Sequence, residues 1–209
     1  MKHIGVIGAS GLMGHGIARN LQSKGFDLSL TVHRNTERVA DLLAAGAKKA
    51  SSQAELGACD AVIICVTGSP QVEEALLGAT GVLSKARAGL IVIDTSTSEP
   101  ESTRRLAALC VEHGAVLVDA PLARTPVEAE LGKLNTMVGA EQAVFDKIRP
   151  VLAAYCENIF HVGGPGAGHI IKLLNNFIGQ AICTATAEAF AVGALAGVQP
   201  QKLVEVISA

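Results

Sequence analysis

The segment Ile4-Gly5-Val6-Ile7-Gly8-Ala9-Ser10-Gly11-Leu12-Met13-Gly14 decides the fold. A short aliphatic run ends on three regularly spaced glycines, which is typical of a buried strand that turns directly into a helix. Glycines permit a tight turn and a close backbone approach to a pyrophosphate, and the helix N-terminus adds free N–H groups. The usual fingerprint is G-x-G-x-x-G, whereas this one is a residue longer, with Ser10 in the turn. Its place at the start of a βαβ unit favours dinucleotide binding over a plain connection. The predicted cofactor-binding residues here are Gly8, Ser10, Gly11, Leu12, Met13 and Gly14.

Short aliphatic runs alternate with helical patterns along most of the chain. Such alternation predicts an α/β fold, here a Rossmann doubly wound, mainly parallel sheet. Helix starts are expected at Ser69-Pro70 and at two capping boxes, Ser52/Glu55 and Ser98/Glu101. The expected strands span residues 2–7, 27–33, 61–66, 90–94, 116–119 and 134–138.

The pattern changes at Gly163-Gly-Pro-Gly-Ala-Gly168, after which the chain is Ala-rich and helical. We therefore expect two domains, a dinucleotide-binding domain at 1–163 and the start of an all-α catalytic or dimerisation domain at 164–209. The polar residues within 173–198 disfavour a membrane span and predict a buried helix. A helix that is apolar on most sides must bury its surface against other residues. We therefore expect either a partner subunit, in a homodimer or homotetramer, or further C-terminal residues beyond an apparently truncated chain.

Composition excludes several classes of function. The chain has 209 residues, 49% of them apolar, and 17 Lys+Arg against 19 Asp+Glu, so it lacks the basic field that nucleic acid requires. Five scattered cysteines without a C-x-x-C pair suggest reduced, buried thiols and a cytoplasmic location. The N-terminus lacks the layout of a signal peptide. The histidines show no ligand spacing, so no metal is expected.

The end of the second expected strand bears on the choice of cofactor. An NAD enzyme usually places an acid there for the ribose hydroxyls, but this segment carries His33, Arg34, Asn35 and, further on, Arg38. Arginines can bind a 2′-phosphate in bidentate fashion, which favours NADP, with NAD possible. The alternative is that these arginines are ordinary solvated charges.

Two further segments suggest substrate chemistry. A loop follows the strand that ends at Asp119, and its Arg124 could clamp a carboxylate, sulfonate or phosphate, or simply face solvent. On the last long helix, Gly168, Lys172 and Asn176 fall on one face. A positioned ammonium there could stabilise charge on a carbonyl oxygen and deliver a proton, although a lone lysine is more often a surface residue.

These segments, in this order, resemble the β-hydroxyacid dehydrogenase family, which includes 3-hydroxyisobutyrate dehydrogenase and belongs with the 6-phosphogluconate dehydrogenase dinucleotide-binding superfamily. The family's motifs are matched by Gly11-Leu-Met-Gly14, by Asp94-Thr-Ser-Thr97 and by the Gly-rich block leading to Lys172 and Asn175-Asn176. The resemblance implies oxidoreduction of a small β-hydroxyacid or semialdehyde, with Lys172 as acid/base and Asn176 orienting the substrate. It also implies cofactor contacts at Val66, Thr67 and Ser96.

The substrate loop departs from the family pattern D-A-P-V-S-G-G. Ala123, Arg124 and Thr125 stand where the family has a serine and two glycines that hold the substrate carboxylate. A subset that includes sulfolactaldehyde reductase has Arg-Thr here, which suggests a more strongly anionic or differently shaped head group. Two alternatives stay open: a dinucleotide-binding or assembly module without turnover, and an imine reductase relative, although the latter typically replaces the lysine.

Overall fold

The computed structural model describes residues 1–32 and 36–209, so His33, Arg34 and Asn35 lie outside the described residues. The chain divides into two compact units, Met1–Lys172 and Leu173–Ala209.

The first unit is built on a nine-stranded sheet. The strand order is β3-β2-β1-β4-β5-β6-β8-β7, and β9 pairs with β8. Neighbouring strands run parallel from β3 to β6, whereas β8 is antiparallel to both β6 and β7 and parallel to β9. The strands are β1 His3–Ile7, β2 Asp27–Thr31, β3 Lys48–Lys49, β4 Ala61–Ile64, β5 Ile91–Asp94, β6 Val116–Asp119, β7 Leu122–Ala123, β8 Leu134–Gly139 and β9 Cys156–Gly163.

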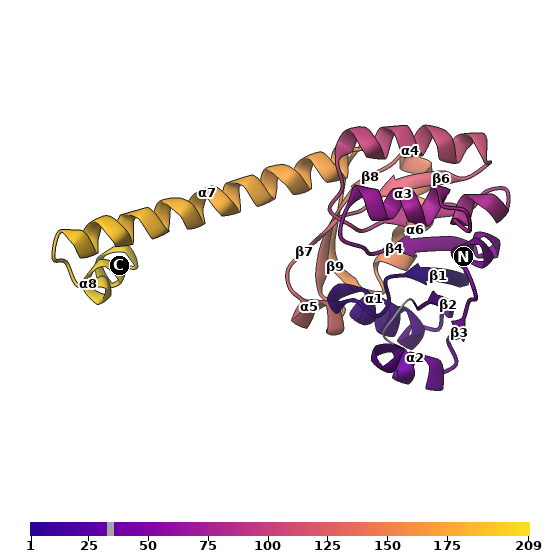
Figure 1. Ribbon diagram of the computed structural model, residues 1–209, viewed down its shortest axis with the longest axis horizontal. Coiled ribbons are helices and arrows are strands. Elements are labelled where there is room, and N and C mark those ends of the chain that lie inside the picture. Colours follow the sequence, from indigo (N-terminus) through magenta and orange to yellow (C-terminus); the bar gives the residue numbers. More distant parts are fainter. Residues whose placement is uncertain (33–35) are drawn as a thin grey trace. The chain divides into compact units, whose positions relative to one another are not determined.

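Helices cover both faces of this sheet, with α3 and α4 on one side and α1 and α2 on the other (Figure 1). Alternate strand residues point to opposite faces, so Ile63 of β4 joins the core under α1 while Ile64 joins the core under α3. The helices are α1 Leu12–Ser23, α2 Ala40–Ala44, α3 Ser69–Leu77, α4 Pro100–Glu112, α5 Pro126–Glu130 and α6 Gln142–Leu152, with 3₁₀ turns at Glu37–Val39, Gln53–Ala58 and Val82–Lys85. The doubly wound α/β fold expected from the sequence is confirmed.

Helical segments begin near all three expected starts, at Ser69, after Ser52 and at Pro100, but the two expected capping boxes are wrong. Ser52 and Ser98 make no capping bonds; the Ser98 hydroxyl donates to Asp94 Oδ2 at 2.9 Å, and Glu55 accepts from Ser51 instead. At α3 the N-cap is Gly68, one residue before Ser69. The Ser98 hydroxyl and the Glu55 carboxylate each bind a residue four positions earlier in the chain, so nearby partners compete with the capping box for the same groups. A capping box does form elsewhere, between Thr125 and Glu128 at the start of α5.

The second unit consists of most of α7 (Ala167–Leu195), whose first residues belong to the first unit, and of α8 (Pro200–Ile207). Helix α7 is long and apolar enough to span a membrane by length and composition alone, and none of its apolar window is buried. The sequence predicts a buried helix, but Phe177, Ile182 and Leu195 are exposed because nothing in the described chain packs over them. Cys183 on this helix is likewise exposed, whereas Cys59, Cys110 and Cys156 are buried as expected.

Helices α1 and α5 approach each other closely at Gly16. A Cβ on Gly16 would lie 2.4 Å from the Ala129 carbonyl carbon, so only glycine fits there. Beside it, the His15 ring bridges two elements: Nδ1 lies 2.7 Å from Glu130 Oε1 of α5, and Nε2 lies 3.1 Å from both carboxylate oxygens of Asp41 in α2. Burial opposes protonation of the ring, but these two carboxylates raise the pKa of His15 above 6.5.

This bridge predicts a pH-dependent contribution to stability. Because the pKa of His15 is raised in the folded state, its contribution is complete below about pH 6.5 and is lost as the pH rises through the raised value. We expect His15→Gln to lower the free energy of unfolding by about 1 kcal/mol at pH 6 and by much less at pH 9. Urea unfolding at both pH values measures this, with His113→Gln on the exposed end of α4 as control. An equal loss at both pH values would contradict the ionic bridge.

Candidate active site

The glycine turn after β1 has the backbone that a phosphate-binding turn requires. Gly8 has φ +92°, and a Cβ there would lie 2.0 Å from the Cys65 carbonyl oxygen. The Gly11 N–H donates to the Gly8 carbonyl at 2.8 Å, which closes the turn that contains the additional residue. A Cβ on Gly14 would lie 2.1 Å from Gly8 O, so α1 packs tightly against the turn. The longer spacing therefore still brings the N-terminus of α1 to the carboxyl end of β1.

A cavity of about 660 Å³ opens beside this turn. Gly8 and Ser10, together with Val66 after β4, are predicted cofactor residues that line it. Its other lining residues include Thr31 and Val32 from the end of β2 and Gln71 and Glu74 from α3. The position at the carboxyl ends of parallel strands and the turn that only glycines can form fit a bound dinucleotide. Sequence reasoning missed Gln71 and Glu74, because nothing local marks a helix residue as facing this cavity.

The ends of β4 and β5 are joined at the same edge. The Val66 N–H donates to Ser96 Oγ at 3.1 Å, and the Ser96 N–H donates to Asp94 Oδ1 at 2.9 Å. Val66 and Ser96, which the family resemblance implied, are thus brought together by the fold. Thr67 follows as an exposed residue.

A buried carboxylate holds the start of α7 against the sheet. Asp119 ends β6 and is fully buried, and its oxygens accept the N–H groups of Gly166 at 2.7 Å and of His169 at 2.9 Å. A Cβ on Gly168 would lie 2.9 Å from Asp119 Oδ2 and 2.3 Å from Met137 O, so glycine permits this contact. Burial raises the pKa of Asp119, against the opposing effect of the two N–H donors.

The His169 side chain extends the same connection to the cofactor edge. The ring is fully buried; Nε2 donates to the Ser96 carbonyl at 3.2 Å, and Nδ1 lies 2.8 Å from Thr103 Oγ1 of α4. Carboxylate oxygens of Asp94 and Asp119 flank the ring at 3.7 and 3.9 Å. Sequence reasoning noted His169 only as lacking metal-ligand spacing. Its partners are 66 and 73 residues away, so no local pattern marks it.

Lys172 lies three residues after His169, on the turn of α7 that these contacts hold. The side chain is partly buried, and this burial lowers the pKa of Lys172 below 10.5. Asn176 follows four residues later and belongs to the second unit.

Arg124 follows β7 in an uncommon conformation. It is the one non-glycine residue among those described with a positive φ, at 81°. Its Nη1 donates to the Lys133 carbonyl at 2.5 Å and to Glu157 Oε2 at 2.6 Å. The guanidinium is therefore paired rather than simply solvated. Ala123 is the last residue of β7, and Thr125 caps α5.

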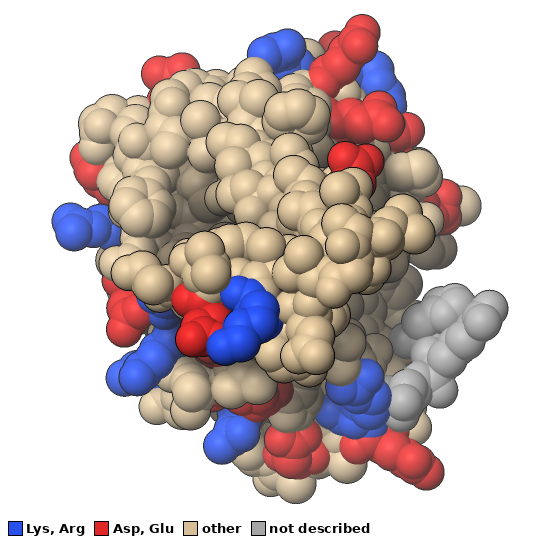
Figure 2. Space-filling view, turned by 90° about the vertical axis from the view of Figure 1, so that its left-hand side faces the viewer, with Lys and Arg blue, Asp and Glu red and all other residues tan. Residues whose placement is uncertain are grey.

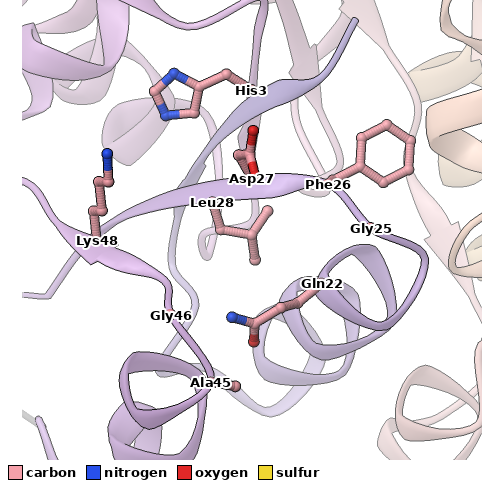
Figure 3. A pocket seen from close by; sticks show the side chains of 9 residues that line it. All are labelled: His3, Gln22, Gly25, Phe26, Asp27, Leu28, Ala45, Gly46 and Lys48. Atoms are coloured by element: carbon pink, nitrogen blue, oxygen red, sulfur yellow. The ribbon is translucent and has the colours of Figure 1, made fainter.

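Other surfaces carry none of the predicted site residues. A hollow of about 500 Å³ lies where β1, β2 and β3 begin, next to His3, Asp27 and Lys48, at the opposite end of the strands from Gly8 (Figure 3). On the face drawn in Figure 2, Lys and Arg are interspersed with Asp and Glu and form no large area of one sign. Among the described residues, no group of three His, Cys, Asp or Glu side chains is placed to hold a metal ion.

The doubly wound sheet, the glycine turn and the cavity beside it define a dinucleotide-binding protein. Comparison with known sequences agrees: residues 3–163 match the NAD binding domain of 6-phosphogluconate dehydrogenase, and residues 166–209 match the corresponding NAD-binding family of NADP-dependent 3-hydroxyisobutyrate dehydrogenase. The chain belongs to the β-hydroxyacid dehydrogenase family.

Individual relatives are similar over nearly the whole chain. The 2-(hydroxymethyl)glutarate dehydrogenase of Eubacterium barkeri is 36% identical over 98% of this chain and 67% of its own length. The NAD-dependent L-serine dehydrogenase of Pseudomonas aeruginosa is 35% identical over 99% of this chain and 69% of its own. The structure of Mycobacterium tuberculosis 3-hydroxyisobutyrate dehydrogenase with L-serine superposes with a TM-score of 0.89 at 29% identity, over 100% of this chain and 70% of that one. The chain thus spans about two thirds of the length of these relatives. Its similarity to them indicates an NAD(P)-dependent oxidoreductase that acts on hydroxyacids.

The glycine turn leads to a binding prediction. Gly14→Ala places a methyl group within 2.1 Å of Gly8 O, so the turn must shift away from the position that a pyrophosphate needs. We expect at least about a tenfold loss of NADPH affinity, about 1.4 kcal/mol, measured by fluorescence titration. Gly179→Ala on α7, where no atom lies within 4 Å of the new methyl group, is the matched control and should bind normally. Unchanged affinity in Gly14→Ala would exclude this turn as the pyrophosphate site.

The buried histidine leads to a stability prediction. His169→Leu removes a donor to Ser96 O and leaves two buried carboxylates without the ring between them. We expect the free energy of unfolding to fall by about 2–3 kcal/mol in urea. His113→Leu, at an exposed position, should change it by less than about 0.5 kcal/mol. Similar effects of the two substitutions would mean that the His169 contacts do not stabilise the fold.

Proposed function

We propose that the protein is an NADP-preferring oxidoreductase that interconverts a small β-hydroxyacid and its semialdehyde, with Lys172 as the general acid/base. One observation carries this proposal. Buried contacts of Asp119 and His169 hold the turn that carries Lys172 beside Ser96, at the edge where the glycine turn and its cavity open. A partly buried amine in that position suits carbonyl chemistry.

Each residue of the proposed site has a separate role in the reaction. The nicotinamide, when bound, supplies or accepts the hydride. Lys172 Nζ donates a proton to the carbonyl oxygen in reduction and accepts the hydroxyl proton in oxidation. Because burial lowers the pKa of Lys172, proton release costs less than from a solvated lysine. Asn176 orients the substrate oxygen, and Arg124, in the loop of Ala123 and Thr125, binds the anionic head group.

The preference for NADP rests on the segment after β2. Arg34, within the segment outside the described residues, and Arg38, in the 3₁₀ turn that follows, are proposed to bind the 2′-phosphate with His33 and Asn35. NAD is the alternative. A second copy of the chain is proposed to cover the exposed apolar residues of α7, in a cytoplasmic homodimer or homotetramer.

The test follows oxidation of NADPH and of NADH with semialdehydes that carry carboxylate, sulfonate or phosphate head groups. We expect turnover with NADPH, and at least about a 10²-fold lower kcat in Lys172→Ala with unchanged NADPH affinity. The rate of reduction should fall as the pH rises through the lowered pKa of Lys172, because the acid must be protonated. Glu112→Gln serves as a remote control.

Other outcomes would overturn the proposal. Tight NADPH binding without turnover on any substrate would support a binding or assembly module. Full activity of Lys172→Ala on imines would support an imine reductase.

A further inference from the structure

We propose that Glu157 restricts the substrate to a singly charged head group, such as a carboxylate or sulfonate, by partly neutralising Arg124. This inference rests on the proposed role of Arg124 as the head-group clamp. The sequence pointed to a more strongly anionic or differently shaped head group, and a singly charged head group fits the second of these alternatives.

The loop fixes where the guanidinium can lie. A left-handed conformation costs a side-chain-bearing residue about 1 kcal/mol, so the surrounding contacts must hold Arg124 in place. They do so on both sides: the capping box of Thr125 and Glu128 begins α5 directly after it, and Lys133 O at the start of β8 accepts from Nη1. Arg124 therefore presents its charge in one defined place rather than sampling solvent.

The side-chain contacts leave part of the guanidinium available. Both bonds from Arg124 use Nη1, and Nε and Nη2 donate to none of the described residues. Because guanidinium carries five donors in a rigid fork, the unused edge can still bind one oxyanion in bidentate fashion. Glu157 thus binds Nη1 of the guanidinium and leaves Nε and Nη2 available for a ligand.

The charged groups close to Arg124 determine how much negative charge a bound head group can carry. Glu157 Oε2 lies 2.6 Å from Nη1, and the side chains of Arg124 and Glu157 are 32% and 46% exposed. Glu128 is also near enough for Arg124 to contribute to its lowered pKa, after the hydrogen bonds from Thr125. Glu157 already offsets part of the single positive charge of Arg124, so the unused guanidinium donors can bind a singly charged head group, whereas a second negative charge on the ligand meets repulsion from Glu157 and Glu128 that no further cation offsets.

The experiment compares two ligands on the same three-carbon hydroxyaldehyde skeleton, one with a sulfonate and one with a phosphate ester. At pH 8 the sulfonate carries one negative charge and the phosphate ester two. Affinity is measured by calorimetry in the presence of NADP⁺, and KM with NADPH, for the wild type and for Glu157→Gln. Glutamine keeps an oxygen that accepts from Nη1 but removes the charge. Glu112→Gln, which removes an exposed charge at the far end of α4, is the matched control.

We expect Glu157→Gln to tighten binding of the phosphate ester about fivefold relative to the sulfonate, and Glu112→Gln to leave the ratio unchanged. An unchanged ratio, or equal weakening of both ligands, would overturn the role of Glu157 in selecting charge. Arg124→Lys separates this failure from that of the proposed function. If Arg124→Lys weakens binding of both ligands while Glu157→Gln leaves the ratio of their affinities unchanged, only the proposed role of Glu157 fails. If neither ligand binds the wild type, or Arg124→Lys changes nothing, the clamp itself is wrong.

Discussion

The rest of the site depends on the contact between the Asp119 carboxylate and the first N–H groups of α7. A helix N-terminus carries unpaired donors and a partial positive charge, and a buried carboxylate at the end of β6 satisfies both. The contact requires that two backbones come unusually close, which Gly168 and Gly139 allow, since a Cβ on either would meet the carboxylate. The first residues of α7, as far as Lys172, are thereby held at the strand edge where the glycine turn opens.

His169 makes that arrangement specific. The carboxylate alone would hold the helix end but leave its rotation about the axis less defined, whereas the ring reaches both Ser96 and Thr103. Three neighbouring segments of the carboxyl edge, from β4, β5 and β6, are then linked through Val66, Ser96 and Asp119. A side chain three residues from Lys172 thus helps to fix the backbone from which the lysine extends, through contacts that do not involve the lysine itself.

Sequence reasoning predicted what is encoded locally. The buried strands β1, β4 and β5 are continuous aliphatic runs, and the glycine turn follows from spacing, so both were found. The strands β3 and β7 have two residues each, and β9 is mostly partly exposed and carries no continuous aliphatic run, so none of the three was predicted. The capping boxes at Ser52 and Ser98 failed because Glu55 and the Ser98 hydroxyl bind other nearby residues, and a short pattern cannot rank such competing partners. The roles of His169 and Glu157 could not be predicted for a different reason, because their partners lie 33 to 73 residues away.

The left-handed backbone at Arg124 implies a conflict between stability and recognition at a single position. The family pattern that this loop resembles has glycine at this place, and glycine adopts such a conformation without strain, so the backbone by itself favours the smallest residue. An arginine that persists in such a place gives up stability that glycine would restore. In a directed-evolution experiment that selected for thermal tolerance alone, this is the loop position at which the arginine would be lost first, together with whatever discrimination between head groups it confers.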